Sequence, residues 1–297
     1  MRFRTRTAFA SICILLAVPT FAWQWPVPAP EVTGTFGQDV GGYLLRGVEI
    51  SGGALPVFPV ERGTVVAVHN ERADLPTGLG SFVVIEHDQG FRSIYAHLAA
   101  GPLPRLGSRV DVETQIAVVG ESGQVRGRSL RLYIIDLRSG IYVNPMLLLP
   151  DLADQTRPTI TNVFARNADS SYDLGRTTAL PAGTYEISAE IYDRLLPDAR
   201  SPRVMPYSIR TFVGGQEGVA AIMDGIVVGP DESRLELSGA TRSRIYAASG
   251  SVRLGDVTVS TGATLFEVVA TDIAGNERNW SVSLIAATPE EAPAGAP

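Results

Sequence analysis

The sequence of 297 residues is poor in histidine and cysteine, the side chains that most often bind zinc or form disulfides. It contains a single cysteine, Cys13, and three histidines, and all 25 of its basic residues are arginine. A chain without disulfides has to be stable through its hydrophobic core, and a content of 45% hydrophobic residues is enough to build one. Beyond the apolar N-terminal stretch, no run approaches the ~20 apolar residues that span a membrane.

Residues 1–22 have the pattern of a secretory signal peptide. Three arginines precede the apolar stretch 8–22, which ends in the small residues of a cleavage site. We expect export across the inner membrane, cleavage before Trp23, and a periplasmic or cell-envelope location. An uncleaved signal anchor is the alternative, and otherwise no membrane span is expected. Cys13 follows an isoleucine instead of a small residue, which argues against a lipoprotein site.

The charge balance excludes some classes of partner. The formal net charge is −6, and loss of the three leader arginines would make it −9. Such an acidic chain is not expected to bind nucleic acid or anionic lipid as its main partner.

The mature chain divides into two regions by composition. Residues 23–150 contain runs rich in valine and isoleucine that alternate with glycine and proline turns, and helical periodicity is nearly absent. A polar break at 151–157 follows, and residues 158–287 again contain short alternating runs. Residues 288–297 are rich in Pro, Ala and Glu and are predicted to be disordered. The sequence therefore predicts an all-β protein with two domains and a tail.

Motifs in the first region follow the order of one known family. They are residues 34–37 (GTFG), 47–50 (GVEI), 57–68 (VFPVERGTVVAV), 82–90 (FVVIEHDQG), 95–98 (YAHL), 106–110 (LGSRV), 116–120 (IAVVG) and 143–145 (VNP). Together they resemble the lysostaphin and LytM-like peptidoglycan endopeptidases, metallopeptidase family twenty-three. The resemblance covers less than half of the chain and implies a twisted antiparallel β-sheet. A shared fold does not by itself imply shared chemistry.

The resemblance also implies a zinc site, and most of its ligands are missing here. The family's H-x-x-x-D stretch reads Leu45 to Glu49, its H-x-H stretch reads Ser129 to Arg131, and His97 is the fifth functional position. A catalytic zinc needs about three protein ligands with lone pairs. Leu45 has no lone pair, and Arg131 is a permanent cation that has only donor groups. Only Glu49 can still act as a ligand, and only His97 keeps the family's residue.

No other histidine restores this site. A second alignment, over a shorter hairpin, places the H-x-H stretch at Arg131 and Tyr133 and also supplies no histidine. His87 ends a strand-like run just before a turn, where a surface or hairpin role is expected, and His69 is expected to be a strand-end residue. We therefore expect no metal or other cofactor, and zinc only if the protein is an enzyme with atypical ligands.

Glu49 and Arg131 are a candidate ion pair across the lost metal site. A guanidinium fork is the best partner for a carboxylate that is removed from water. In the alternative, both side chains turn to solvent, and a separation of more than about 4 Å would exclude the pair. For His97, a packing or hydrogen-bonding role and contact with a ligand are both open.

The end of the second region resembles a different kind of domain. Residues 265–285 (LFEVVATDIAGNERNWSVSLI) are similar to the last hairpin of bacterial immunoglobulin-like domains, in which D-x-A-G-N forms the turn. This implies an immunoglobulin-like β-sandwich over residues 158–287. At the turn, Asp272 and Asn276 favour a side-chain-capped turn over a calcium site.

These patterns favour a catalytically inactive relative of a peptidoglycan endopeptidase. Similar degenerate domains of that family act as binding or regulatory modules, so the expected partner is peptidoglycan or a cell-wall hydrolase. The expected ligand groove is lined by Tyr95, His97, Glu49, Arg131 and Tyr133. Two rivals are an active zinc endopeptidase that cleaves peptidoglycan cross-bridges with atypical ligands, and a structural or adhesive envelope protein.

Overall fold

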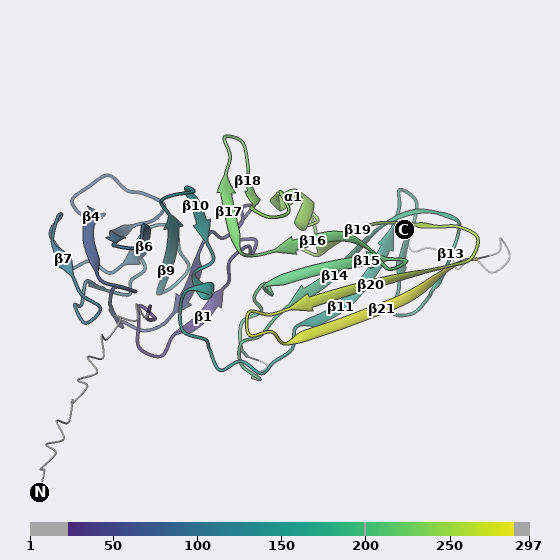
Figure 1. Ribbon diagram of the computed structural model, residues 1–297, viewed down its shortest axis with the longest axis horizontal. Coiled ribbons are helices and arrows are strands. Elements are labelled where there is room, and N and C mark those ends of the chain that lie inside the picture. The colour runs from purple at the N-terminus through teal and green to yellow at the C-terminus, as the bar shows by residue number, and fades with distance from the viewer. Residues whose placement is uncertain (1–22, 199, 288–297) are drawn as a thin grey trace, which may run out of the picture.

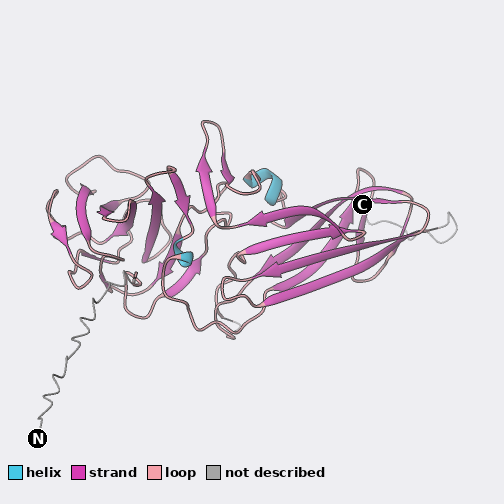
Figure 2. Cartoon of the chain, in the orientation of Figure 1, coloured by secondary structure: helices cyan, strands magenta, loops and turns pink. Residues whose placement is uncertain are grey.

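The computed structural model describes residues 23–198 and 200–287, which form two regions of β-structure (Figure 1, Figure 2). The predicted signal peptide at 1–22 and the predicted tail at 288–297 lie outside the described residues. Within the described part, no helix is both long and apolar enough to cross a membrane. The all-β prediction is confirmed, because the described helices are two short segments.

The first region contains ten strands and one short helix. They are β1 (Glu31–Gly34), β2 (Val48–Ser51), β3 (Pro56–Val57), β4 (Gly63–His69), β5 (Ser81–His87), β6 (Phe91–Leu98), β7 (Arg109–Val110), β8 (Ala117–Val118), β9 (Ser129–Asp136), β10 (Ile141–Val143) and the 3-10 helix η1 (Pro145–Leu147). Their alternating apolar side chains bury one face of the sheet, as the period of a strand requires.

The second region contains eleven strands and a single-turn helix. They are β11 (Thr159–Arg166), β12 (Ser171–Asp173), β13 (Ala179–Leu180), β14 (Gly183–Tyr192), β15 (Ser208–Val213), β16 (Gln216–Ile222), β17 (Gly225–Val228), β18 (Ser233–Leu235), α1 (Arg242–Ile245), β19 (Val252–Val259), β20 (Ala263–Thr271) and β21 (Glu277–Ala286).

The main sheet has ten strands. Its order is β18-β17-β10-β9-β6-β5-β4-β7, and β2 pairs with β9 and with β1. All of these pairings are antiparallel, as the family resemblance implies. β3 and β8 form a separate two-stranded sheet.

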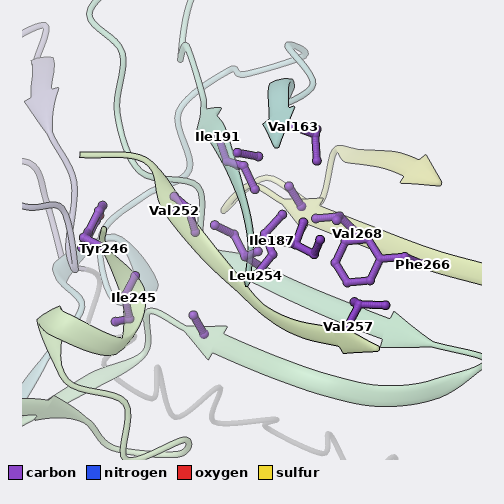
Figure 3. Packing of buried hydrophobic residues seen from close by; sticks show 14 of the residues in the cluster. Val163, Ile187, Ile191, Ile245, Tyr246, Val252, Leu254, Val257, Phe266 and Val268 are labelled. Carbon is purple, nitrogen blue, oxygen red and sulfur yellow. The ribbon is translucent and has the colours of Figure 1, made fainter. Parts of the chain in front are cut away.

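Two further sheets form the second region. One has the order β12-β11-β14-β19, and the other has the order β13-β21-β20-β15-β16, in which β13 runs parallel to β21. Figure 3 shows side chains of both sheets in one hydrophobic cluster, with Val163 and Ile187 from the first and Phe266 and Val268 from the second. The apolar faces of the two sheets therefore cover each other.

A hairpin of the second region completes the sheet of the first. β17 pairs with β10, with Ile226 opposite Tyr142, and β18 pairs with β17. Figure 1 shows this hairpin beside β10, away from the two sheets of the second region. The backbone edge of β10 is therefore occupied by the chain itself. The division into domains at 23–150 and 158–287 stays a prediction.

The two regions also exchange core residues. Phe36 and Leu44, from the first region, are buried in the hydrophobic cluster of the second. Leu195 and Val204, from the second, are buried in the cluster of the first. Since each core contains side chains from the other region, the junction is tightly packed and not a flexible linker.

Gly47 permits the close approach of β2 to β9. A Cβ atom at this position would lie 2.1 Å from the carbonyl oxygen of Leu132, a backbone atom that cannot move away without disrupting β9. We expect Gly47→Ala to lower the free energy of unfolding by about 1–3 kcal/mol, as overpacking does. Urea denaturation measures this difference.

Gly53 supplies the matched control for that substitution. No atom lies within 4 Å of a Cβ built on Gly53. Gly53→Ala should therefore change the free energy of unfolding by less than about 0.5 kcal/mol. Equal effects of the two substitutions would contradict the close approach.

Candidate functional site

Glu49 and Arg131 face each other across adjacent strands. β2 and β9 pair antiparallel with these two residues in direct register, so their side chains lie on the same face of the sheet. Arg131 Nη2 lies 2.6 Å from Glu49 Oε2, and the two side chains are 9% and 21% exposed. The ion pair expected from the sequence is confirmed, and the alternative in which both turn to solvent is wrong.

Leu45 lies beside Glu49 and brings no polar atom to the site. A Cβ built on Gly34 would lie 3.2 Å both from Glu49 Cβ and from a methyl carbon of Leu45, so the two side chains flank the same glycine. Leu45 is fully buried. The position where the family resemblance implies a histidine ligand is filled by packed hydrocarbon.

His97 occupies an irregular point of β6. Its φ is 65°, in the left-handed region that residues other than glycine rarely adopt. Tyr95 and Leu98 both belong to the core cluster although they are three residues apart, so His97 is the extra residue of a bulge. Backbone strain of this kind occurs often at functional sites.

The imidazole of His97 is held in one orientation. Its Nδ1 lies 2.9 Å from the carbonyl oxygen of Ser122, which makes Nδ1 the donor and leaves Nε2 as an acceptor. Burial lowers the pKa of His97; the Ser122 carbonyl, Glu49 and Glu71 raise it, and the charge of Arg131 lowers it further. The ring is therefore neutral at pH 7.

Three buried polar atoms around the ion pair have no protein partner among the described residues. They are His97 Nε2, Ser129 Oγ and Arg131 Nε. The set offers an acceptor, a hydroxyl and a charged donor. Buried polar atoms are normally hydrogen-bonded, so this set favours a site that a polar ligand or water completes.

Tyr133 continues the site along β9. Burial raises the pKa of its hydroxyl, and the nearby charge of Arg131 opposes this shift. Burial also acts against the charge of Arg131, but Tyr133 and Glu49 together raise the pKa of Arg131 above its usual value. Both side chains therefore keep their ordinary charge states, neutral for Tyr133 and positive for Arg131.

Two side chains that the sequence did not single out extend this surface. The Tyr142 ring lies edge-on to Tyr133 with centroids 6.1 Å apart, and the guanidinium of Arg46 lies 5.0 Å from the centre of Tyr142. Arg46 directly follows Leu45 in the stretch that corresponds to the family's H-x-x-x-D ligands. This position was the only feature of the sequence that could have linked Arg46 to the site.

Tyr95 does not belong to this site, which corrects the expected groove. Its side chain is fully buried in the core, where the hydroxyl accepts from the backbone N–H of Val60 and from the Ser93 hydroxyl. The cause is the two-residue period of the strand: Ala96 pairs with Arg131, so Tyr95 points to the opposite face.

The two remaining histidines make their contacts with other residues. His87 ends β5 and is buried, with its ring nitrogens 3.0 Å from the carbonyl oxygen of Arg62 and 2.8 Å from Ser93 Oγ. Of the two roles expected for it, the surface role is wrong, and the hairpin role agrees with its position at the end of β5 before the turn to β6. His69 ends β4, as expected, with Nδ1 3.6 Å from an oxygen of Asp74.

The side chains at this site do not fit a catalytic zinc. Leu45 offers no ligand atom, and Arg131 places a cation against the carboxylate of Glu49. Among the described residues, only one set of His, Cys, Asp or Glu side chains brings three donor atoms within 4.8 Å of one another, and it includes neither Glu49 nor His97. Among the described residues, Glu49 and His97 therefore have no third His, Cys, Asp or Glu ligand close enough to complete an atypical zinc site with them.

Comparison with known proteins gives the family of the first region. Residues 44–145 match the model of Peptidase family M23, and a second family model matches residues 157–286. The chain is 30% identical over 135 residues to the murein hydrolase activator NlpD of Escherichia coli, which covers 45% of this chain and 33% of that protein. It is 29% identical over 129 residues to an uncharacterized protein of Treponema pallidum, which covers 38% of this chain and 86% of that one.

Among solved structures, the catalytic domain of the antimicrobial peptidase lysostaphin from Staphylococcus simulans is similar with a TM-score of 0.32 and 19% identity. The match covers 39% of this chain and 86% of that one. The chain spans about a third of the length of the hydrolase activator that it matches. The motifs, the antiparallel sheet and the family match agree, and residues 44–145 of this chain form a domain of peptidase family M23.

Proposed function

We propose that this protein is a catalytically inactive M23 protein that binds the cell wall or regulates a murein hydrolase. The observation that carries the proposal is the Glu49–Arg131 ion pair at the position of the family's zinc. The pair replaces the charge of a metal with the charge of a side chain, and without a metal the family's means of acidifying water for hydrolysis is lost.

The polar atoms around the ion pair support a binding role. His97 Nε2, Ser129 Oγ and Arg131 Nε match the donors and acceptors of a peptide, and the half-buried ring of Tyr142 packs against the buried ring of Tyr133. The relative in Escherichia coli is named a murein hydrolase activator, which favours regulation of a separate enzyme.

The ligand is bound by side chains and not by addition of a strand at β10. That edge is paired with β17, so it offers no free backbone groups to an extended peptide at Tyr142. We therefore assign the ligand to the face that carries His97, Arg131 and Tyr133. A stem peptide of peptidoglycan or a loop of a hydrolase fits this description.

For the second region we propose an immunoglobulin-like β-sandwich. The support is its strand order: β11, β14 and β19 correspond to strands A, B and E of that fold, and β16, β15, β20 and β21 correspond to C′, C, F and G. The hairpin β17–β18 is then an insertion between strands C′ and E. We further propose export through the signal sequence at 1–22 and a periplasmic location.

Metal content and peptidoglycan digestion test the inactive state directly. The chain from Trp23 onward, produced in zinc-supplemented medium, is expected to contain almost no zinc and to release no fragments from isolated peptidoglycan. Stoichiometric zinc together with chelator-sensitive cleavage would establish an active enzyme and overturn the proposal.

A binding assay separates the proposed role from a structural one. We expect the chain to co-sediment with peptidoglycan or to raise the activity of a purified murein hydrolase, and Tyr133→Ala to weaken that effect. Leu237→Ala, at an exposed position of the second region, serves as the control. A folded chain with no affinity for wall fragments or hydrolases would favour a spacer or adhesive protein instead.

A further inference from the structure

Three buried carboxylates from distant parts of the chain meet at the junction of the two regions. Asp154 lies in the segment before β11, Asp193 follows β14, and Asp272 follows β20. Each offers an oxygen, and these three oxygens all lie within 4.8 Å of one another. The residues are 8%, 2% and 2% exposed.

The carboxylates are only partly satisfied by the protein. Asp154 Oδ1 accepts from the backbone and the hydroxyl of Thr156, at 2.8 and 2.5 Å. Both oxygens of Asp272 accept from Asn276, which confirms the capped turn expected from the sequence and leaves further lone pairs free. Asp154 Oδ2 and Asp193 Oδ1 are buried and have no partner among the described residues.

Three ionised carboxylates in such a small buried volume repel one another, and either protonation or a cation between them relieves the repulsion. Burial is the largest of the effects that together raise the pKa of Asp193 to about 7; a backbone hydrogen bond at Arg194 opposes the shift, and the charges of Asp154 and Asp272 add to it. Burial likewise raises the pKa of Asp272, with a further contribution from Asp154. Burial thus disfavours the ionised form of these carboxylates, although the fold brings three of them together.

We propose that Asp154, Asp193 and Asp272 bind one calcium ion. Oxygens on opposite sides of a Ca²⁺ ion with bonds of ~2.4 Å are ~4.8 Å apart, so the observed separations fit a shared ion. A set made only of oxygen atoms selects a hard cation over zinc. Calcium accepts irregular geometry and bidentate carboxylates, whereas magnesium requires a near-ideal octahedron.

The position of this site gives the ion a structural role. Leu152, Leu195 and Ile273, each within two residues of one of the aspartates, pack against the hydrophobic cluster of the first region. The ion therefore joins the connecting segment to two loops of the second region at the point where all three contact the M23 domain. Calcium binding fixes the orientation of one region against the other.

Calcium titration of the chain from Trp23 onward tests the proposal. After treatment with a chelator and its removal, calorimetry is expected to show one Ca²⁺ per chain, and the thermal midpoint should rise with calcium until the site is saturated. Asp193→Asn should weaken binding at least about 10-fold, since it removes one of three anionic ligands. Asp256→Asn, at an exposed position of β19, should leave the affinity unchanged.

The metal-free proteins supply an independent readout. Without calcium, Asp193→Asn removes charge repulsion and should have a thermal midpoint equal to or above that of the unsubstituted chain; with saturating calcium the order should reverse. No saturable binding up to ~10 mM calcium, about ten times the dissociation constant of the weakest protein sites, would overturn the proposal. Equal weakening by Asp256→Asn, or tighter binding of magnesium or zinc, would overturn it as well.

Discussion

Arg131→Ala is expected to destabilise the protein by about 3 kcal/mol, at the lower end of the range for breaking a buried ion pair. The substitution removes the partner of Glu49 and leaves a carboxylate that is only 21% exposed without a counter-charge. Burial makes an unpaired charge costly because water no longer solvates it. Chemical denaturation of the chain from Trp23 onward measures the change.

Two further variants separate the pair from general packing effects. The double substitution Glu49→Gln and Arg131→Met leaves no unpaired charge and should cost less than Arg131→Ala alone, by at least about 1 kcal/mol. Arg210→Ala breaks a comparable pair with Glu217 at 2.7 Å, but at the surface, and should cost less than about 1 kcal/mol. If Arg210→Ala lowered the free energy of unfolding as much as Arg131→Ala does, this would contradict a special contribution of the buried pair.

Restoring the family's ligand types is expected to restore metal binding. In the triple variant Leu45→His, Glu49→Asp and Arg131→His, three side chains with lone pairs replace a hydrocarbon, a longer carboxylate and a cation. Zinc content should rise from near zero to about one per chain, since about three such ligands hold a zinc ion. Elemental analysis after dialysis measures the stoichiometry.

The control for this variant keeps Arg131. With only Leu45→His and Glu49→Asp, the guanidinium still lies against the carboxylate and repels a metal cation. This double variant should bind no zinc after dialysis. Equal zinc content in the double and triple variants would show that Arg131 does not control the site, and stoichiometric zinc in the unsubstituted chain would contradict the loss of the site.

Residue types alone were enough to predict that the zinc ligands are missing. A leucine cannot ligate a metal and an arginine repels one in any conformation, so this conclusion needs no coordinates. The ion pair was also predicted, although its partners are 82 positions apart, because the family resemblance places both at one site.

The neighbours of the ion pair depended on strand geometry. Tyr95 belongs to the Y-A-H-L motif, yet the pairing of Ala96 with Arg131 turns it into the core. The bulge at His97 then turns the imidazole of His97 toward Arg131, and the charge of Arg131 helps to lower the pKa of His97. A bulge is a property of two paired strands, so the sequence of one strand does not reveal it.

The sequence by itself determined the all-β class and the M23 motifs and predicted the loss of the zinc ligands, because each follows from local periodicity or from the chemistry of single side chains. Only the tertiary structure decided three other features: the hairpin β17–β18 on the edge of β10, the exchange of core residues between regions, and the meeting of Asp154, Asp193 and Asp272. Each requires segments far apart in the chain to be packed together. Local sequence carries no information about such contacts until the register of the strands and the packing of the cores are known.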